Sequence, residues 1–171
     1  SPLGIGPVTV NVPSFYNWSG WPYNGADLWF DTGIDIAAGQ TLSITASGLV
    51  SLGGGVSAGP DGACFNSDCG GQYPVIPYTF LSSLIGKIGG TTAVGTGTPV
   101  PEGVAGKGPG FVGSSYRQVI PQSGRLFLTV NDQIWFNDNS GSFSATIRVL
   151  GASLAAAPLV EWYDPSSPTN Q

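Results

Sequence analysis

Five Asp and Asn residues, whose side chains carry oxygen atoms, lie between Val130 and Ser140. They are Asn131, Asp132, Asn137, Asp138 and Asn139. Carboxylate and amide oxygens suit calcium, which takes roughly six to eight oxygen ligands. The same residue types are also typical of turns, because their side chains hydrogen-bond to nearby main chain and tolerate left-handed conformations. Composition alone leaves both interpretations open and favours the turn.

Two segments that alternate apolar and polar side chains flank this oxygen-rich loop. They are residues 125–130 before it and residues 143–149 after it. Such alternation is typical of half-buried β-strands, because successive side chains of a strand point to opposite faces. We therefore predict a strand-loop-strand hairpin that holds the oxygen-bearing side chains between its two strands.

Strands are also predicted at residues 8–12 and 41–46 from the same alternation, and at residues 84–88 and 116–120. In the second of these, Leu42, Ile44 and Ala46 should face the core. The Gly- and Pro-rich residues 53–81 and 89–113 are predicted to form long loops, the second running along the surface. With 27 Gly, 14 Pro and 9% charged residues in 171, the chain favours an all-β domain over a helical or disordered one.

The charge and the missing histidine narrow the classes of function. A net charge of -5 with only five Lys and Arg residues argues against nucleic-acid binding, which needs clustered cations. Without histidine the chain lacks Ser-His-Asp, Cys-His and the usual zinc hydrolase sites. A glycosidase-like carboxylate pair stays open, but Glu102 and Glu161 both lie in Pro/Gly-rich or tail sequence. We therefore expect no enzyme.

The cysteines and the N-terminal residues indicate an exported protein that is periplasmic, on the cell surface or extracellular. Cys64 and Cys69 are the only cysteines, and we expect them to close one small disulfide loop. A redox pair or a metal site is the alternative, although zinc usually needs four Cys or His ligands. The start Ser1-Pro2-Leu3 is as expected after removal of a signal peptide, and no apolar run is long enough for a transmembrane helix.

Several segments resemble one known family in the same order along the chain. The pair Asn131-Asp132 followed by residues 138–143 (DNSGSF) resembles the calcium and sugar loop of the PA-IL-like (LecA-type) galactose-binding bacterial lectins. Residues 44–53 with 59–62, and then 84–89, resemble two further blocks of that family. Over roughly residues 27–150 the resemblance implies a jelly-roll-like antiparallel β-sandwich in which one calcium ion bridges the protein to two sugar hydroxyls.

The resemblance also implies a set of metal ligands. Asp132 matches the aspartate that binds the metal and the sugar, Asp138 and Asn139 match a pair of asparagines, and Leu52 falls where a main-chain carbonyl completes the shell. Gln133 and Trp135 join Asp132 and Asp138 as the expected sugar-contacting residues. The loop is one residue shorter than in the galactose binders, a threonine ligand has no clear counterpart, and the His-Pro sugar contact is missing. Calcium is therefore better supported than galactose.

We accordingly divide the chain into three parts. Residues 1–24 form an N-terminal strand with an aromatic-rich extension, residues 25–150 form a lectin-like β-sandwich domain, and residues 151–171 form an apolar and then polar tail.

The first hypothesis for the function is a calcium-dependent module that binds a galactose-type or other glycan. The alternative is a structural subunit whose aromatic and apolar ends dock on a periplasmic or envelope membrane-protein assembly.

Overall fold

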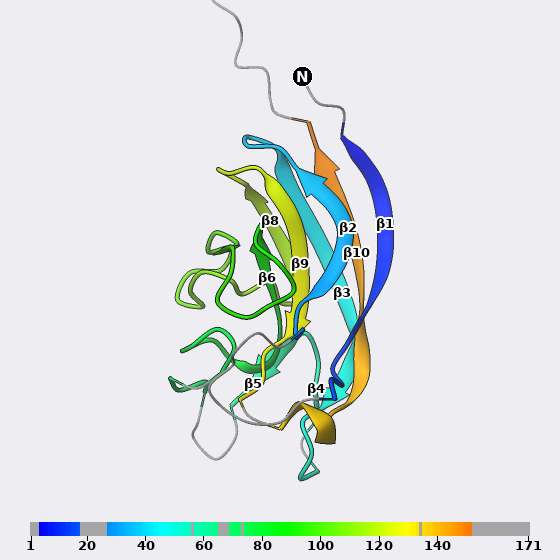
Figure 1. The fold of residues 1–171 in the computed structure, drawn as a ribbon, viewed down its shortest axis with the longest axis vertical. Coiled ribbons are helices and arrows are strands. Elements are labelled where there is room, and N and C mark those ends of the chain that lie inside the picture. Colours follow the sequence, from blue (N-terminus) through cyan, green and yellow to red (C-terminus); the bar gives the residue numbers. More distant parts are fainter. Residues whose placement is uncertain are drawn as a thin grey trace, which may run out of the picture.

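Two five-stranded antiparallel sheets pack face to face in the computed structural model (Figure 1), which describes residues 4–17, 27–55, 57–64, 69–72, 74–133 and 135–151. The all-β, jelly-roll-like sandwich predicted from the sequence is confirmed. The first sheet contains β1 (Ile5–Pro13), β3 (Thr41–Ser51), β4 (Ser57–Ala58), β8 (Ser115–Val119) and β10 (Ser140–Leu150). The second contains β2 (Phe30–Ile36), β5 (Asp61–Ala63), β6 (Leu81–Ile88), β7 (Thr98–Pro99) and β9 (Gly124–Val130).

The first sheet is built around β10, which pairs with β1 on one side and with β3 on the other. Alternate residues of β10 are fully buried against the second sheet, namely Phe143, Ala145, Ile147 and Val149. Burying each of the larger side chains contributes roughly 1.5–3 kcal/mol. Leu42 and Ile44 of β3 are also fully buried, as predicted, while Ala46 is only partly buried.

The predicted hairpin of residues 125–149 is wrong in its pairing. β9 pairs with β2 and β6 in the second sheet, whereas β10 pairs with β1 and β3 in the first. The loop between them, residues 131–139, therefore crosses from one sheet to the other at the lower end of Figure 1. Packed sheets lie about 10 Å apart, a gap that nine residues span easily. The alternation identified both strands correctly, but it carries no information about partners.

The second sheet is covered on its outer face, so that β6 is buried on both sides. All eight residues of β6 are buried. The segment 89–113 contributes to this cover, and its Val100 and Val112 are fully buried in the core between the sheets. Most of the segment runs along the surface, as predicted, but Val100 and residues 110–113 are buried. Single valines among many glycines give no periodic signal, yet they close the edge of β6.

Lys87 of β6 lies buried under this cover. Its Nζ donates hydrogen bonds to the carbonyl oxygens of Thr91, Ala93 and Thr96 at 2.7, 3.0 and 2.7 Å. The ammonium also lies 4.9 Å from the ring centroid of Trp29, and burial lowers its pKa to about 8. The lysine thus holds the turn that follows β6 against the sheet.

A pocket of about 250 Å³ opens beside Lys87 and is also lined by Trp29, Val75, Ile76 and Val94. The ammonium is already bonded to the surrounding carbonyls, so it offers little to a ligand there.

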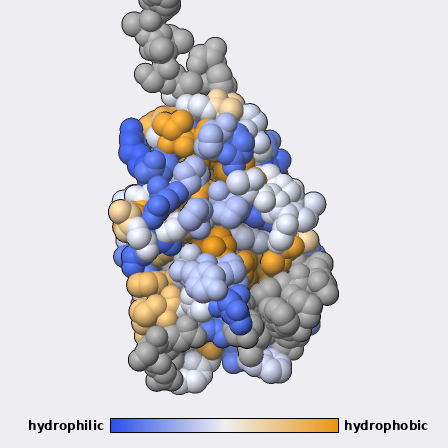
Figure 2. All heavy atoms as spheres, turned by 90° about the vertical axis from the view of Figure 1, so that its left-hand side faces the viewer, coloured by the Kyte–Doolittle hydropathy of each residue, from blue (hydrophilic) through white to orange (hydrophobic). Residues whose placement is uncertain are grey.

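Figure 2, which faces the left-hand side of Figure 1, shows apolar and polar patches side by side rather than one continuous apolar area. No helix in the described ranges is long and apolar enough to cross a membrane.

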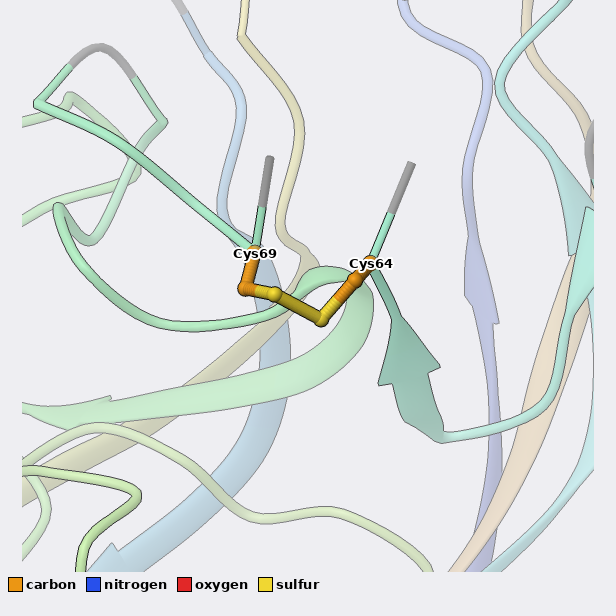
Figure 3. The surroundings of a disulfide bond; sticks show 2 residues. All are labelled: Cys64 and Cys69. Carbon is orange, nitrogen blue, oxygen red and sulfur yellow. A yellow bond between two sulfur atoms is a disulfide. The ribbon is translucent and has the colours of Figure 1, made fainter. Parts of the chain in front are cut away.

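The disulfide between Cys64 and Cys69, predicted from the sequence, is present just after β5 (Figure 3). The segment between the two cysteines, residues 65–68, lies outside the described residues. Replacing both cysteines by serine should lower the free energy of unfolding by about 2 kcal/mol, because a short closed loop restricts the unfolded chain. Urea unfolding of the double variant beside the oxidised parent measures this loss. Equal midpoints would mean that the bond does not contribute to stability.

Candidate functional site

The loop of residues 131–139 is fixed to the body of the sandwich by one buried aromatic residue. Phe136, at the start of the short 3-10 helix Phe136–Asp138, is fully buried. Its ring meets the ring of Tyr16 edge to face, with centroids 6.0 Å apart, and its carbonyl accepts a hydrogen bond from Tyr16 N at 3.3 Å. The polar residues on either side of Phe136 are therefore held in place.

Asn139 is held in one orientation by two acceptors. Its Nδ2 donates to the carbonyl oxygen of Ser14 at 2.9 Å and to Asp132 Oδ2 at 2.8 Å. Because both partners accept, the amide oxygen must face the other way. That oxygen, Oδ1, is buried and has no hydrogen-bond partner among the described residues. A buried acceptor without a partner costs roughly 1–3 kcal/mol, so it calls for an explanation such as a bound ion.

Asp132 sits beside Asn139 in a place that disfavours its negative charge. The residue is only 7% exposed, and its Oδ1 accepts a hydrogen bond from Gln133 N at 2.6 Å. Burial raises the pKa of Asp132 above its ordinary value, and the charge of Asp138 raises it further, against the opposing hydrogen bonds from Asn139 and Gln133. A nearby positive charge would stabilise this carboxylate.

Asp138 is exposed, and its carboxylate lies against the main chain that follows β3. A Cβ atom on Gly53 would lie 2.6 Å from Asp138 Oδ2, so a larger residue there would push the carboxylate aside. Gly53 also has a φ of 80°, which side chains rarely adopt. Leu52 is the residue between Gly53 and Ser51, and Ser51 pairs with Ser140 of β10. The fold therefore brings Leu52, Asp138 and Asn139 to one place.

The oxygen atoms that lie close together here fit a hard divalent cation. Two carboxylates, one free amide oxygen and the adjacent main chain offer oxygen atoms only, as calcium prefers. Within the residues that the structure describes, no three His, Cys, Asp or Glu residues come together as a metal site. A cation at this loop must therefore use amide and main-chain oxygens besides Asp132 and Asp138, which calcium does and zinc rarely does.

Two of the five oxygen-bearing residues predicted for the loop do not join this group. Asn137 is exposed, and Asn131 points to the outer face of the second sheet. Asn131 Oδ1 accepts from Ile76 N at 3.0 Å, and its Nδ2 donates to the carbonyl oxygens of Ile76 and Thr79 at 3.2 and 3.0 Å. Asn131 follows Phe127 and Thr129 at every second position, and this alternation is the signal that separates it from Asp132.

The two predicted sugar-contacting residues beside the carboxylates differ in exposure. Trp135 is 54% exposed. Gln133 is half-buried, and its main-chain N–H donates a hydrogen bond to Asp132 Oδ1. Sequence reasoning missed the roles of Ser14, whose carbonyl oxygen accepts from Asn139 Nδ2, and of Gly53, which lies against the Asp138 carboxylate. Nothing local marks them, because each acquires its role from a segment far away in the chain.

Comparison with known proteins adds one structural likeness. No protein-family model matches the chain, and no curated protein sequence matches it. A solved structure described as "EclA N-terminal domain; PllA-like lectin" is similar, with 20% sequence identity and a TM-score of 0.48. The similarity covers 82% of this chain and 94% of that one. A likeness at this level carries no argument about function, which depends on the geometry of the site.

Proposed function

We propose that this chain is a non-catalytic, calcium-dependent carbohydrate-binding module of an exported protein. The observation that carries the proposal is the buried Oδ1 of Asn139, which has no hydrogen-bond partner among the described residues, on a side chain whose Nδ2 donates to the carboxylate of Asp132. The resemblance of this loop to the calcium and sugar loop of the galactose-binding lectins supports the same metal. The disulfide supports an oxidising compartment, where such bonds persist.

Asp132, Asp138, Asn139 and the main-chain carbonyl of Leu52 would hold the ion. A calcium ion bound there would supply open coordination positions for two neighbouring hydroxyls of a galactose-type or other sugar. Asp132 and Gln133 would hydrogen-bond to those hydroxyls, and the exposed ring of Trp135 would cover an apolar face of the sugar.

Calcium added to chelator-treated protein should raise the thermal midpoint of unfolding in a saturable way. At a hundredfold excess over its dissociation constant, a ligand that binds only the folded state adds about 2.7 kcal/mol. For a chain of this size that corresponds to roughly 5–11 °C. The rise should require a higher calcium concentration in Asp138→Asn, because an amide oxygen binds the ion less tightly than the carboxylate does and the exposed side chain can be changed without disturbing the core. Differential scanning calorimetry with and without calcium measures both.

The matched control is Asp35→Asn, which neutralises an exposed aspartate at the opposite end of β9, where Asp35 pairs with Arg125. Its calcium response should equal that of the parent. If calcium leaves the parent midpoint unchanged, or if Asp138→Asn and Asp35→Asn respond alike, the metal site is refuted. Titration of the calcium-loaded parent with monosaccharides then tests the sugar, and no calcium-dependent binding at millimolar sugar would refute that part.

The alternative function, docking on a periplasmic or envelope membrane-protein assembly, depends on the two apolar ends of the chain. Of these, residues 18–26 and 152–171 lie outside the described residues. Nothing in the described part favours this alternative over sugar binding, so it stays a prediction from the sequence.

A further inference from the structure

Three aromatic side chains in the described part of the chain are half exposed or more. They are Phe15, Trp135 and Tyr78, with exposed fractions of 50%, 54% and 74%. The other described aromatic side chains are buried or half-buried. Rings that are half exposed or more bury less apolar surface than core aromatic residues do, and their exposed faces are open to a ligand.

All three rings lie on segments that are bonded to the proposed calcium loop or its flanks. Phe15 lies between Ser14, whose N–H donates to the carbonyl oxygen of Gly141 at 3.2 Å, and Tyr16, whose N–H donates to that of Phe136 at 3.3 Å. Trp135 belongs to the loop itself, and its carbonyl oxygen accepts from Asp138 N at 3.3 Å.

Tyr78 reaches the same end of the sandwich from the other side of the loop. It lies in a turn whose flanking carbonyls, of Ile76 and Thr79, both accept hydrogen bonds from the Asn131 amide. Just before this turn, Val75 N donates to the carbonyl oxygen of Asp132 at 3.1 Å. The segments that carry Phe15 and Tyr78 are therefore both bonded to the loop that contains Asp132 and Trp135.

The backbone of Tyr78 is strained, with a φ of 62°. Nearly all other positions with a positive φ in the described residues are glycines; the exception besides Tyr78 is Ser82. A glycine would fit this position with less strain, and the tyrosine gains nothing from burial. Strain of this kind concentrates at functional sites, where it places a side chain that function requires.

We propose that Phe15, Trp135 and Tyr78 form an aromatic platform on which an uncharged oligosaccharide of two or more sugar residues binds across the calcium loop. This inference rests on the proposed function, to which it adds the class of ligand. Sugar rings have an apolar face that packs on aromatic side chains. The carboxylates of Asp132 and Asp138 balance the charge of a divalent cation, so the site has no excess charge to attract an acidic sugar.

The test compares monosaccharides with longer chains of the same sugars. Calorimetric titration of the calcium-loaded full chain would use galactose, glucose, mannose and xylose beside the tetrasaccharides galactotetraose, cellotetraose, mannotetraose and xylotetraose. We expect one tetrasaccharide to bind at least about tenfold more tightly than its monosaccharide. Tyr78→Gly should remove about tenfold of the tetrasaccharide affinity and leave monosaccharide binding unchanged, while its unfolding midpoint stays level or rises because the strain is relieved.

Two control variants separate the ring from general effects. Tyr78→Phe keeps the ring and should keep the tetrasaccharide affinity, and Val119→Ala changes an exposed apolar side chain of β8, remote from the calcium loop. If the tetrasaccharides bind no more tightly than the monosaccharides, or if Tyr78→Gly binds them as the parent does, the platform is refuted and the calcium module stands. If no sugar binds in the presence of calcium, the proposed function and this inference fail together.

Discussion

Replacing Asn131 by alanine is expected to lower the free energy of unfolding by about 4 kcal/mol, among the larger losses that a single substitution causes. The side chain is fully buried, and it bonds to both the N–H and the carbonyl of Ile76 and to the carbonyl of Thr79. Its removal leaves these main-chain groups without partners in a place that water does not reach, and each such group costs roughly 1–3 kcal/mol.

Urea unfolding measures this loss, and Asn137→Ala is the matched control. Asn137 is an exposed asparagine six positions further along the same loop, so its replacement should change the unfolding free energy by less than about 0.5 kcal/mol. A loss below about 1 kcal/mol for Asn131→Ala would contradict the structural role given to this amide. It would also mean that the Asn131 amide does not hold the turn that carries Tyr78.

Replacing Gly48 by alanine is expected to cost about 3 kcal/mol or more. Gly48 lies inside β3, directly opposite Phe143 of β10, with a φ of 114°. A Cβ atom there would lie 2.5 Å from the carbonyl oxygen of Ser142. Because that oxygen belongs to the backbone of the central strand, the overlap is relieved only by moving β3 away from β10, in addition to the strain of the unfavourable φ.

Gly6→Ala provides the control for Gly48, since a Cβ atom at Gly6 would meet nothing within 4 Å. We expect it to leave the urea midpoint within experimental error of the parent. Loss of the β3–β10 pairing should also displace Gly53 and Leu52, which follow β3, and so weaken the calcium response of Gly48→Ala. Unchanged stability in Gly48→Ala would mean that the two strands do not approach as closely as the structure indicates.

Local pattern was enough to identify most strands and the chemistry of the loop. Alternation located β9 and β10, because side chains on a strand point to opposite faces whatever the strand pairs with. It also placed Leu42 and Ile44 in the core, and the close spacing of Cys64 and Cys69 predicted their disulfide. The oxygen-bearing residues of the loop were likewise visible, since metal-binding chemistry depends on residue type before it depends on position.

Strand pairing, and with it the composition of the site, was decided only by the tertiary structure. The alternation is the same for a hairpin and for two strands in opposite sheets, so the sequence did not show that the loop crosses the sandwich. Contacts between distant segments then separated the oxygen-bearing residues. The Asn131 side chain is hydrogen-bonded to the main chain of Ile76 and Thr79. Asn139 is held by its bond to Ser14, and its Oδ1 has no hydrogen-bond partner among the described residues.

The sequence by itself thus determined an all-β domain with an oxygen-rich loop and one disulfide, because these features follow from residue type and short-range spacing. The tertiary structure decided which oxygens are available to a cation and which aromatic rings surround them. Those properties depend on hydrogen bonds and steric contacts between residues more than fifty positions apart, such as Ile76 and Asn131. No local pattern contains such contacts, since each is formed only when the two sheets and their loops pack together.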